Sequence, residues 1–63
     1  NVEESLERVL EIYRYLITLF QKALDVTDEE GDDVTNDIFV GAKADLEKTV
    51  WMLAAELGQA PGL

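Results

Sequence analysis

Cysteine and histidine are both absent from the 63-residue sequence. Without cysteine the chain has no disulfide framework, no thiolate metal site and no cysteine nucleophile. Without histidine it lacks imidazole acid–base chemistry and every metal or triad motif that contains histidine. No apolar run approaches the roughly 20 residues that a membrane span needs, and no signal-peptide pattern is present. These absences exclude imidazole and thiol chemistry in this stretch and argue against a membrane span.

Basic residues are scarce. Five Lys and Arg stand against 14 Asp and Glu, which gives a formal net charge of −9. No basic patch is available to neutralise phosphates, so the composition argues against nucleic-acid binding through this segment. Hydrophobic residues nevertheless make up 48% of the chain, too many for a disordered acidic tail. The first residue is Asn1 rather than an initiator Met, which indicates a processed, cleaved or excerpted chain.

Helical spacing dominates residues 2 to about 25. One set of apolar residues recurs every three or four positions over five turns, and a second set recurs every seven positions beside it. Glu4–Arg8 and Glu11–Arg14 are also spaced for ion pairs along a helix. Two apolar sets predict a helix that is contacted on more than one side. The first set is Leu6, Val9, Leu10, Tyr13, Leu16, Ile17, Phe20, Ala23 and Leu24, and the second is Ile12, Leu19 and Val26.

An acidic turn over about residues 26–33, containing Gly31, interrupts this pattern. The helical period returns over about residues 34–57, and residues 58–63 form a tail. Two helices of similar length with a short connection predict an all-α fold, an antiparallel helical hairpin. The apolar period of the second helix comprises Val34, Ile38, Ala42, Leu46, Val50, Leu53 and Leu57, flanked by Phe39, Ala44, Trp51 and Met52.

The ends of the second helix carry recognisable signals. Asp33 or Thr35 can cap its start, and Gly58 followed by Pro61 is the usual stop. A single seam between two helices buries little apolar surface, and neither a disulfide nor a metal cage is available to stabilise the hairpin. We therefore expect partner helices, from the same parent protein or from other subunits.

The acidic residues cluster around the turn. Seven of the 14 fall within residues 25–37, with no Lys or Arg among them. A solvated loop beside a helix N-terminus is the simplest interpretation. An EF-hand calcium loop requires Gly at the sixth position and Glu at the twelfth, and no register satisfies both. In a third interpretation Asp28, Asp33 and Asp37, repeated around a symmetry axis, form rings of carboxylates that attract cations.

Three motifs in residues 31–63 carry a family resemblance. They are Asp-Asp-Val-Thr-Asn-Asp at 32–37, Leu-Glu-Lys-Thr-Val-Trp-Met-Leu at 46–53, and Leu-Gly-Gln-Ala-Pro at 57–61. Together they resemble the C-terminal helix of the Dps family of mini-ferritins, and most of all its streptococcal peroxide-resistance branch, Dpr. Residues 2–30 are similar to the preceding long helix of that family, with weaker markers.

The resemblance implies half of a ferritin-like four-helix bundle that assembles into a hollow, cytoplasmic dodecamer. Such cages oxidise Fe(II) with hydrogen peroxide and store the ferric product, which gives iron storage and peroxide resistance. The family's ferroxidase ligands are histidines and carboxylates of the earlier helices, so the iron would be bound mainly by the missing N-terminal half. This segment alone is expected to have no catalytic residue. Asp28, Asp33 and Asp37 fall on positions that line the pore through which iron enters.

The other candidate residues are expected to be structural. We expect Trp51 to pack in the bundle rather than take part in iron chemistry, and Tyr13 and Tyr15 to lie in the bundle or at an interface. Asp45, Glu47 and Glu56 match no ligand motif and are expected to be solvated or paired through Lys43 and Lys48. The alternative function is a self-contained acidic helical hairpin that acts as a protein-interaction module.

Overall fold

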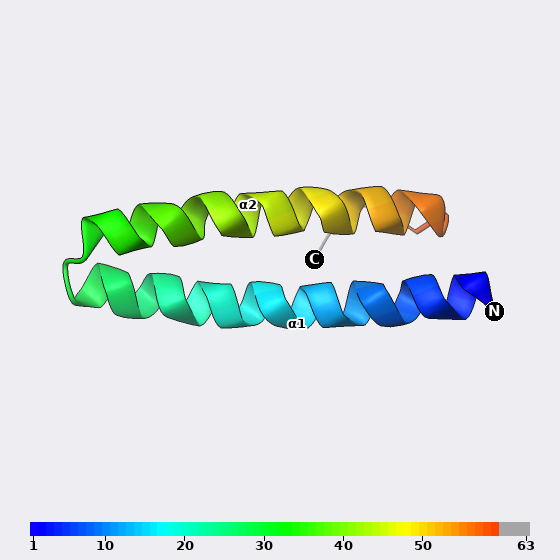
Figure 1. Cartoon of the computed structure of the whole chain (residues 1–63), viewed down its shortest axis with the longest axis horizontal. Helices are drawn as coiled ribbons and strands as arrows, with labels where there is room; N and C mark the ends of the chain where they lie inside the picture. Colours follow the sequence, from blue (N-terminus) through cyan, green and yellow to red (C-terminus); the bar gives the residue numbers. More distant parts are fainter. Residues whose placement is uncertain (60–63) are drawn as a thin grey trace.

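The structure, a computed structural model that describes residues 1–59, contains two helices joined by a tight turn. Helix α1 spans Val2–Glu29 and helix α2 spans Asp33–Glu56. They run antiparallel along a rod of 44 × 14 × 14 Å (Figure 1). The predicted all-α hairpin is confirmed. Neither helix contains an apolar stretch long enough to cross a membrane, within the part of the chain that the structure describes.

Both helices end in the same way. Gly31 and Gly58 adopt positive φ angles of 71° and 73°, a conformation that glycine enters without the steric cost of a Cβ. After α1, the Asp32 amide donates to the Thr27 carbonyl at 2.8 Å and the Gly31 amide donates to the Asp28 carbonyl at 3.1 Å. The corresponding bonds follow α2, so each helix ends in a Schellman motif that satisfies its last carbonyls.

The turn is shorter than the sequence predicts. Helix α1 continues to Glu29 rather than ending near residue 25, so only residues 30–32 separate the two helices. The acidic residues do not stop α1, because their backbone amides and carbonyls still make helical hydrogen bonds, and the turn comes at Gly31. The N-cap of α2 is Asp32, one residue before the first predicted candidate. The tail residues 60–63, including Pro61, lie outside the described residues.

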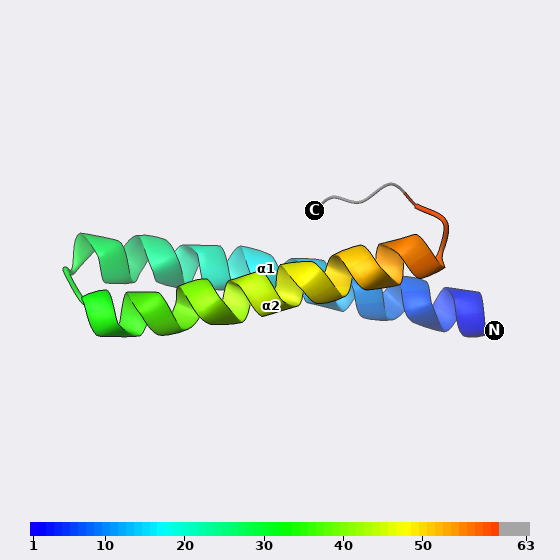
Figure 2. The same ribbon diagram turned by 90° about the horizontal axis from the view of Figure 1, so that it is seen from above.

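The core lies where the two helices face each other, in the half of the hairpin away from the turn. Four side chains are buried there, namely Leu10, Ile17, Val50 and Ala54. Tyr13, Leu46, Leu53 and Leu57 pack around them. Nearer the turn, Phe20 and Phe39 meet edge to face with ring centroids 5.4 Å apart. The helices cross at a shallow angle when seen from above (Figure 2).

Much apolar surface remains exposed on this hairpin. Ile12, Leu19 and Val26, the second apolar set of α1, are 52%, 38% and 57% exposed. On α2 the exposed apolar side chains include Val34 and Ile38, which belong to its predicted apolar period. Large exposed apolar patches mark interaction surfaces. The hairpin thus has faces suited to further helices, as the two sets predict.

Some predicted contacts are not made within the hairpin. Tyr15 is largely exposed and Trp51 is about half exposed, whereas Tyr13 packs against the core. Neither Glu4–Arg8 nor Glu11–Arg14 forms an ion pair among residues 1–59, where the side chain of Glu4 instead closes a capping box with Asn1.

Lys43 pairs with Glu47 at 3.5 Å across one helical turn, as predicted, and no other lysine ion pair is present among residues 1–59.

Candidate functional site

The acidic residues occupy the turn end of the rod, where α1 ends and α2 begins (Figure 1). All seven acidic residues of segment 25–37 are exposed. Those on α1 lie at its C-terminus, where the helix dipole is negative, and no basic residue occupies the last turn. Carboxylates and dipole therefore repel one another there. A cation at this end of α1 would relieve that repulsion.

Asp32 has a structural role within this cluster. Its carboxylate accepts a hydrogen bond of 3.1 Å from the Thr35 amide and so caps α2. The hydroxyl and the backbone amide of Thr35 hold the pKa of Asp32 below its ordinary value of 3.8. Asp32 is thus ionised at neutral pH and is engaged by the helix that it begins. Because its carboxylate serves the backbone, we do not assign it to a metal.

A half-buried polar contact joins α2 to α1 beside the turn. The Asn36 side-chain amide donates to the Leu24 carbonyl at 3.1 Å and to the Thr27 hydroxyl at 3.0 Å. Thr27 in turn donates to the Ala23 carbonyl at 2.8 Å. We call this contact between Thr27 and Asn36 the latch. The apolar spacing does not predict this latch, although two polar residues on the inward faces of otherwise apolar helices are a usable signal.

The structure places the three predicted pore residues at the same end of the hairpin but does not join them into a cage. Asp33 and Asp37 lie one helical turn apart on α2, and Asp28 lies in the last turn of α1. Among residues 1–59, no three His, Cys, Asp or Glu side chains are grouped so that they hold a metal ion. A single hairpin therefore presents open carboxylates.

The calcium-loop interpretation also fails on the structure. Residues 25–29 are helical and only three residues separate the helices, whereas an EF-hand loop wraps 12 residues around its ion. In a single hairpin, the acidic segment is therefore a solvent-exposed turn, as the simplest interpretation predicts.

A family model for the ferritin-like domain matches residues 1–63, the whole chain. The chain belongs to the ferritin-like family. Its two antiparallel helices and its unpartnered apolar faces agree with membership of a family built from helical bundles.

Individual relatives of this ferritin-like chain are proteins named DNA protection during starvation protein. That of Streptococcus suis (strain P1/7) is 68% identical over 63 residues, which is 100% of this chain and 37% of the relative, in its C-terminal part. That of Listeria innocua is 43% identical over 61 residues, or 97% of this chain and 39% of the relative. That of Agrobacterium fabrum is 38% identical over 57 residues, which is 90% of this chain and 35% of the relative.

These matches confirm the resemblance to the Dps mini-ferritins. They also show that the chain spans less than two-fifths of the length of the relatives it matches.

Proposed function

We propose that this chain is the C-terminal half of the bundle in a Dps-like iron-storage protein, which protects its cell from iron and peroxide in the cytoplasm. The family match over the whole chain and the 68% identity to the Streptococcus suis protein carry this proposal. The chain supplies two bundle helices, surfaces for neighbouring subunits and an acidic pore. Its partners are the N-terminal half of the same protein and further copies of itself, in a dodecamer.

The redox step belongs to the rest of the protein. Two ferrous ions give two electrons to one hydrogen peroxide, which takes up two protons and leaves as two water molecules; the two ferric ions pass to the mineral. Iron and peroxide are the substrates. The 63 residues contain no histidine, and no three of the described carboxylates are grouped to hold a metal. We therefore assign the ferroxidase ligands to the N-terminal half of the protein and none to this segment.

Asp28, Asp33 and Asp37 are the residues that we assign to the pore through which iron enters. All three are exposed at the turn end, and a net charge of −9 with no basic residue in segment 25–37 makes this end strongly negative. Three hairpins meeting at this end around one axis bring together nine carboxylates. A narrow passage lined by such rings concentrates divalent cations and speeds their arrival.

The test replaces Asp28, Asp33 and Asp37 with Asn in the full-length protein that contains this chain. We expect slower Fe(II) uptake, followed by stopped-flow absorbance of the ferric product, with the assembled mass unchanged. A triple variant at Glu11, Asp45 and Glu56, each changed to its amide, alters net charge equally but lies away from the turn. Equal uptake by the two variants and the parent protein would contradict the pore assignment.

Intact-mass and native-mass measurements test the larger proposal. A Dps-like protein gives a polypeptide more than twice as long as this chain, since the relatives are that long, and a high-mass closed assembly. A stable, helical, monomeric 7.1 kDa species that binds basic proteins would instead favour the protein-interaction module.

A further inference from the structure

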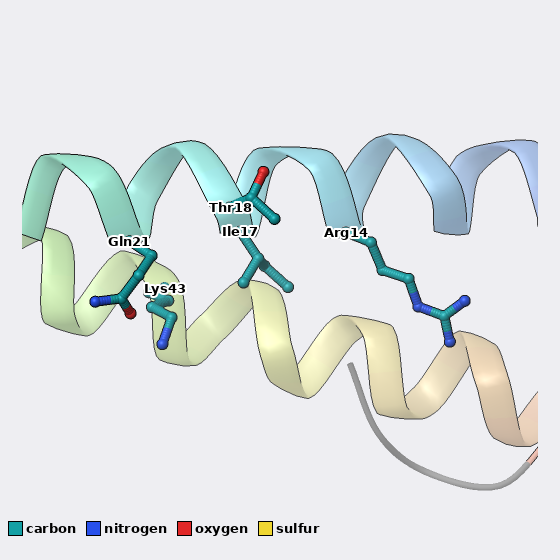
Figure 3. Close-up of a pocket in the computed structure, with 5 residues that line it drawn as sticks. All are labelled: Arg14, Ile17, Thr18, Gln21 and Lys43. Carbon is teal, nitrogen blue, oxygen red and sulfur yellow. The ribbon is translucent and has the colours of Figure 1, made fainter.

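The latch is the one place where side-chain hydrogen bonds join the two helices. Among residues 1–59 these bonds are made by the Asn36 amide, and no other side chain bonds or pairs across from one helix to the other. Gln21 of α1 and Lys43 of α2 line one cavity farther from the turn (Figure 3), yet each forms its bond within its own helix. The orientation of the helices at the turn end therefore depends on the latch and on the turn itself.

Thr27 holds α2 at two points. Its carbonyl accepts from the Asp32 amide at 2.8 Å, and its hydroxyl accepts from the Asn36 amide at 3.0 Å. Asp32 and Asn36 are four residues apart, which is about 6 Å along a helix. An attachment at Asp32 alone would leave the start of α2 free to swing about the turn. A second attachment about one turn further along restricts that swing.

Each residue of this double attachment is followed directly in the sequence by a carboxylate that we assign to the pore. The successive pairs are Thr27–Asp28, Asp32–Asp33 and Asn36–Asp37. The Leu24 carbonyl provides a further link between the helices. It accepts from the Asn36 side chain at 3.1 Å, and in an α-helix the same carbonyl also accepts from the backbone amide of Asp28. The latch thus shares its backbone with the three carboxylates.

Helix geometry places these carboxylates on one side of the hairpin. Thr27 and Asn36 are half-buried and bond to each other, so both face the opposite helix. The next residue of an α-helix lies about 100° further round the axis. Because α1 and α2 are antiparallel (Figure 1), this rotation carries Asp28 and Asp37 to the same side. Asp33, three residues before Asn36, is rotated from it by about 60° in the same direction. The inward direction of the latch therefore determines the side that the carboxylates occupy.

We propose that Thr27 and Asn36 are positioning residues for the iron-entry pore. This inference rests on the proposed function, in which Asp28, Asp33 and Asp37 line that pore. Copies arranged around one axis attract a cation most strongly when every copy directs its carboxylates toward the axis. Functional groups keep such an arrangement when hydrogen-bonded neighbours hold them in place. Loss of the latch should therefore impair the entry of Fe(II) and spare the redox step, which belongs to the rest of the protein.

Thr27→Val in the full-length protein tests this role, because it removes the hydroxyl and keeps the shape of the side chain. Charged passages raise association rates by about 10- to 1,000-fold, and we expect the loss of part of that gain to slow ferric product formation at limiting Fe(II) by about three- to tenfold. The rate at saturating Fe(II), with hydrogen peroxide in excess, should be unchanged because the redox step then limits it. Stopped-flow absorbance over a series of Fe(II) concentrations separates the two regimes.

Two substitutions serve as controls. Thr27→Ser keeps the hydroxyl and should restore the parent rate at limiting Fe(II). Thr49→Val makes the same chemical change at a hydroxyl that bonds only to the Asp45 carbonyl of its own helix, and it should leave both rates unchanged. Asn36→Ala removes the other partner of the latch and should slow the limiting rate as Thr27→Val does. It decides the question if Thr27→Val fails to assemble.

A combined variant shows whether the latch acts through the pore. Thr27→Val added to Asp28→Asn, Asp33→Asn and Asp37→Asn should cause no further loss, because the carboxylates to be positioned are then gone. The same additional loss in that background would overturn the inference, since the latch would act elsewhere.

Three other results would also overturn it: an unchanged limiting rate in the latch variants, an equal loss in Thr49→Val, or an equal fall of the limiting and saturating rates. The last would indicate a general structural role. The pore assignment itself fails if the three Asp→Asn changes leave uptake unaltered. If those changes slow uptake and the latch variants do not, the inference about the latch fails alone.

Discussion

Removing the hydroxyl of the latch should loosen the turn end without unfolding the bundle. Thr27→Val keeps the shape of the side chain but takes away the acceptor that Asn36 uses at 3.0 Å and the donor to the Ala23 carbonyl. Losing one such bond and leaving the Asn36 amide short of a partner costs about 1–2 kcal/mol. That cost corresponds to a rise of roughly five- to 30-fold in the population of the locally opened turn, since 1.4 kcal/mol is a factor of ten.

Hydrogen exchange with mass spectrometry measures this opening directly. Peptides that cover residues 24–40 should exchange faster in the Thr27→Val protein by that factor, while peptides from the opposite end of the helices stay unchanged. Thr49→Val is the matched control, because the Thr49 hydroxyl bonds only to the Asp45 carbonyl of its own helix. Thr27→Ser, which keeps the hydroxyl, should exchange like the parent. Equal exchange at the turn in Thr27→Val and Thr49→Val would refute a latch between the helices.

Two further predictions concern stability. Leu10→Ala removes a side chain that is 1% exposed in the core and should lower the free energy of unfolding by about 2–5 kcal/mol in urea denaturation, whereas Val2→Ala, at a position 77% exposed, should change it little. The pKa of Asp32 is lower in the folded chain than its ordinary value of 3.8, so the unfolded chain binds more protons near that pH. The stability that this cap contributes is therefore complete above pH 3.8 and is lost as the pH falls through the folded pKa. Asp32→Asn should remove that part of the acid dependence of the urea midpoint.

The hairpin itself followed from the sequence because apolar spacing and glycine placement are local signals. Leu10, Ile17 and Val50 stand in the predicted apolar sets and are buried. The predicted end of α1 near residue 25 is too early, because clustered acidic residues alone do not break a helix. Backbone hydrogen bonding carries the helix through them until Gly31 adopts a positive φ.

The latch and the exposure of Trp51 depend on how the two helices pack against each other. Local sequence patterns do not predict that packing. Asn36 finds its acceptors 9 and 12 residues away, across the turn. The candidate pore residues were identified from charge density and family motifs, and the structure adds that one hairpin leaves them open. In the proposed pore their arrangement around an ion would depend on contacts between copies, which the residue spacing of a single chain does not determine.

Asp32 makes a capping hydrogen bond to each of the two helices. Its amide closes the end of α1 by bonding to Thr27, and its carboxylate opens α2 by accepting from Thr35. Exposed loop tips are usually where peptides are inserted or a chain is circularly permuted with least harm. Here a cut or insertion beside Asp32 would disrupt these hydrogen bonds, and the C-terminus of α1 and the N-terminus of α2 would lose their caps together. A protein engineer who wishes to display a tag on this molecule should leave its most accessible bend intact.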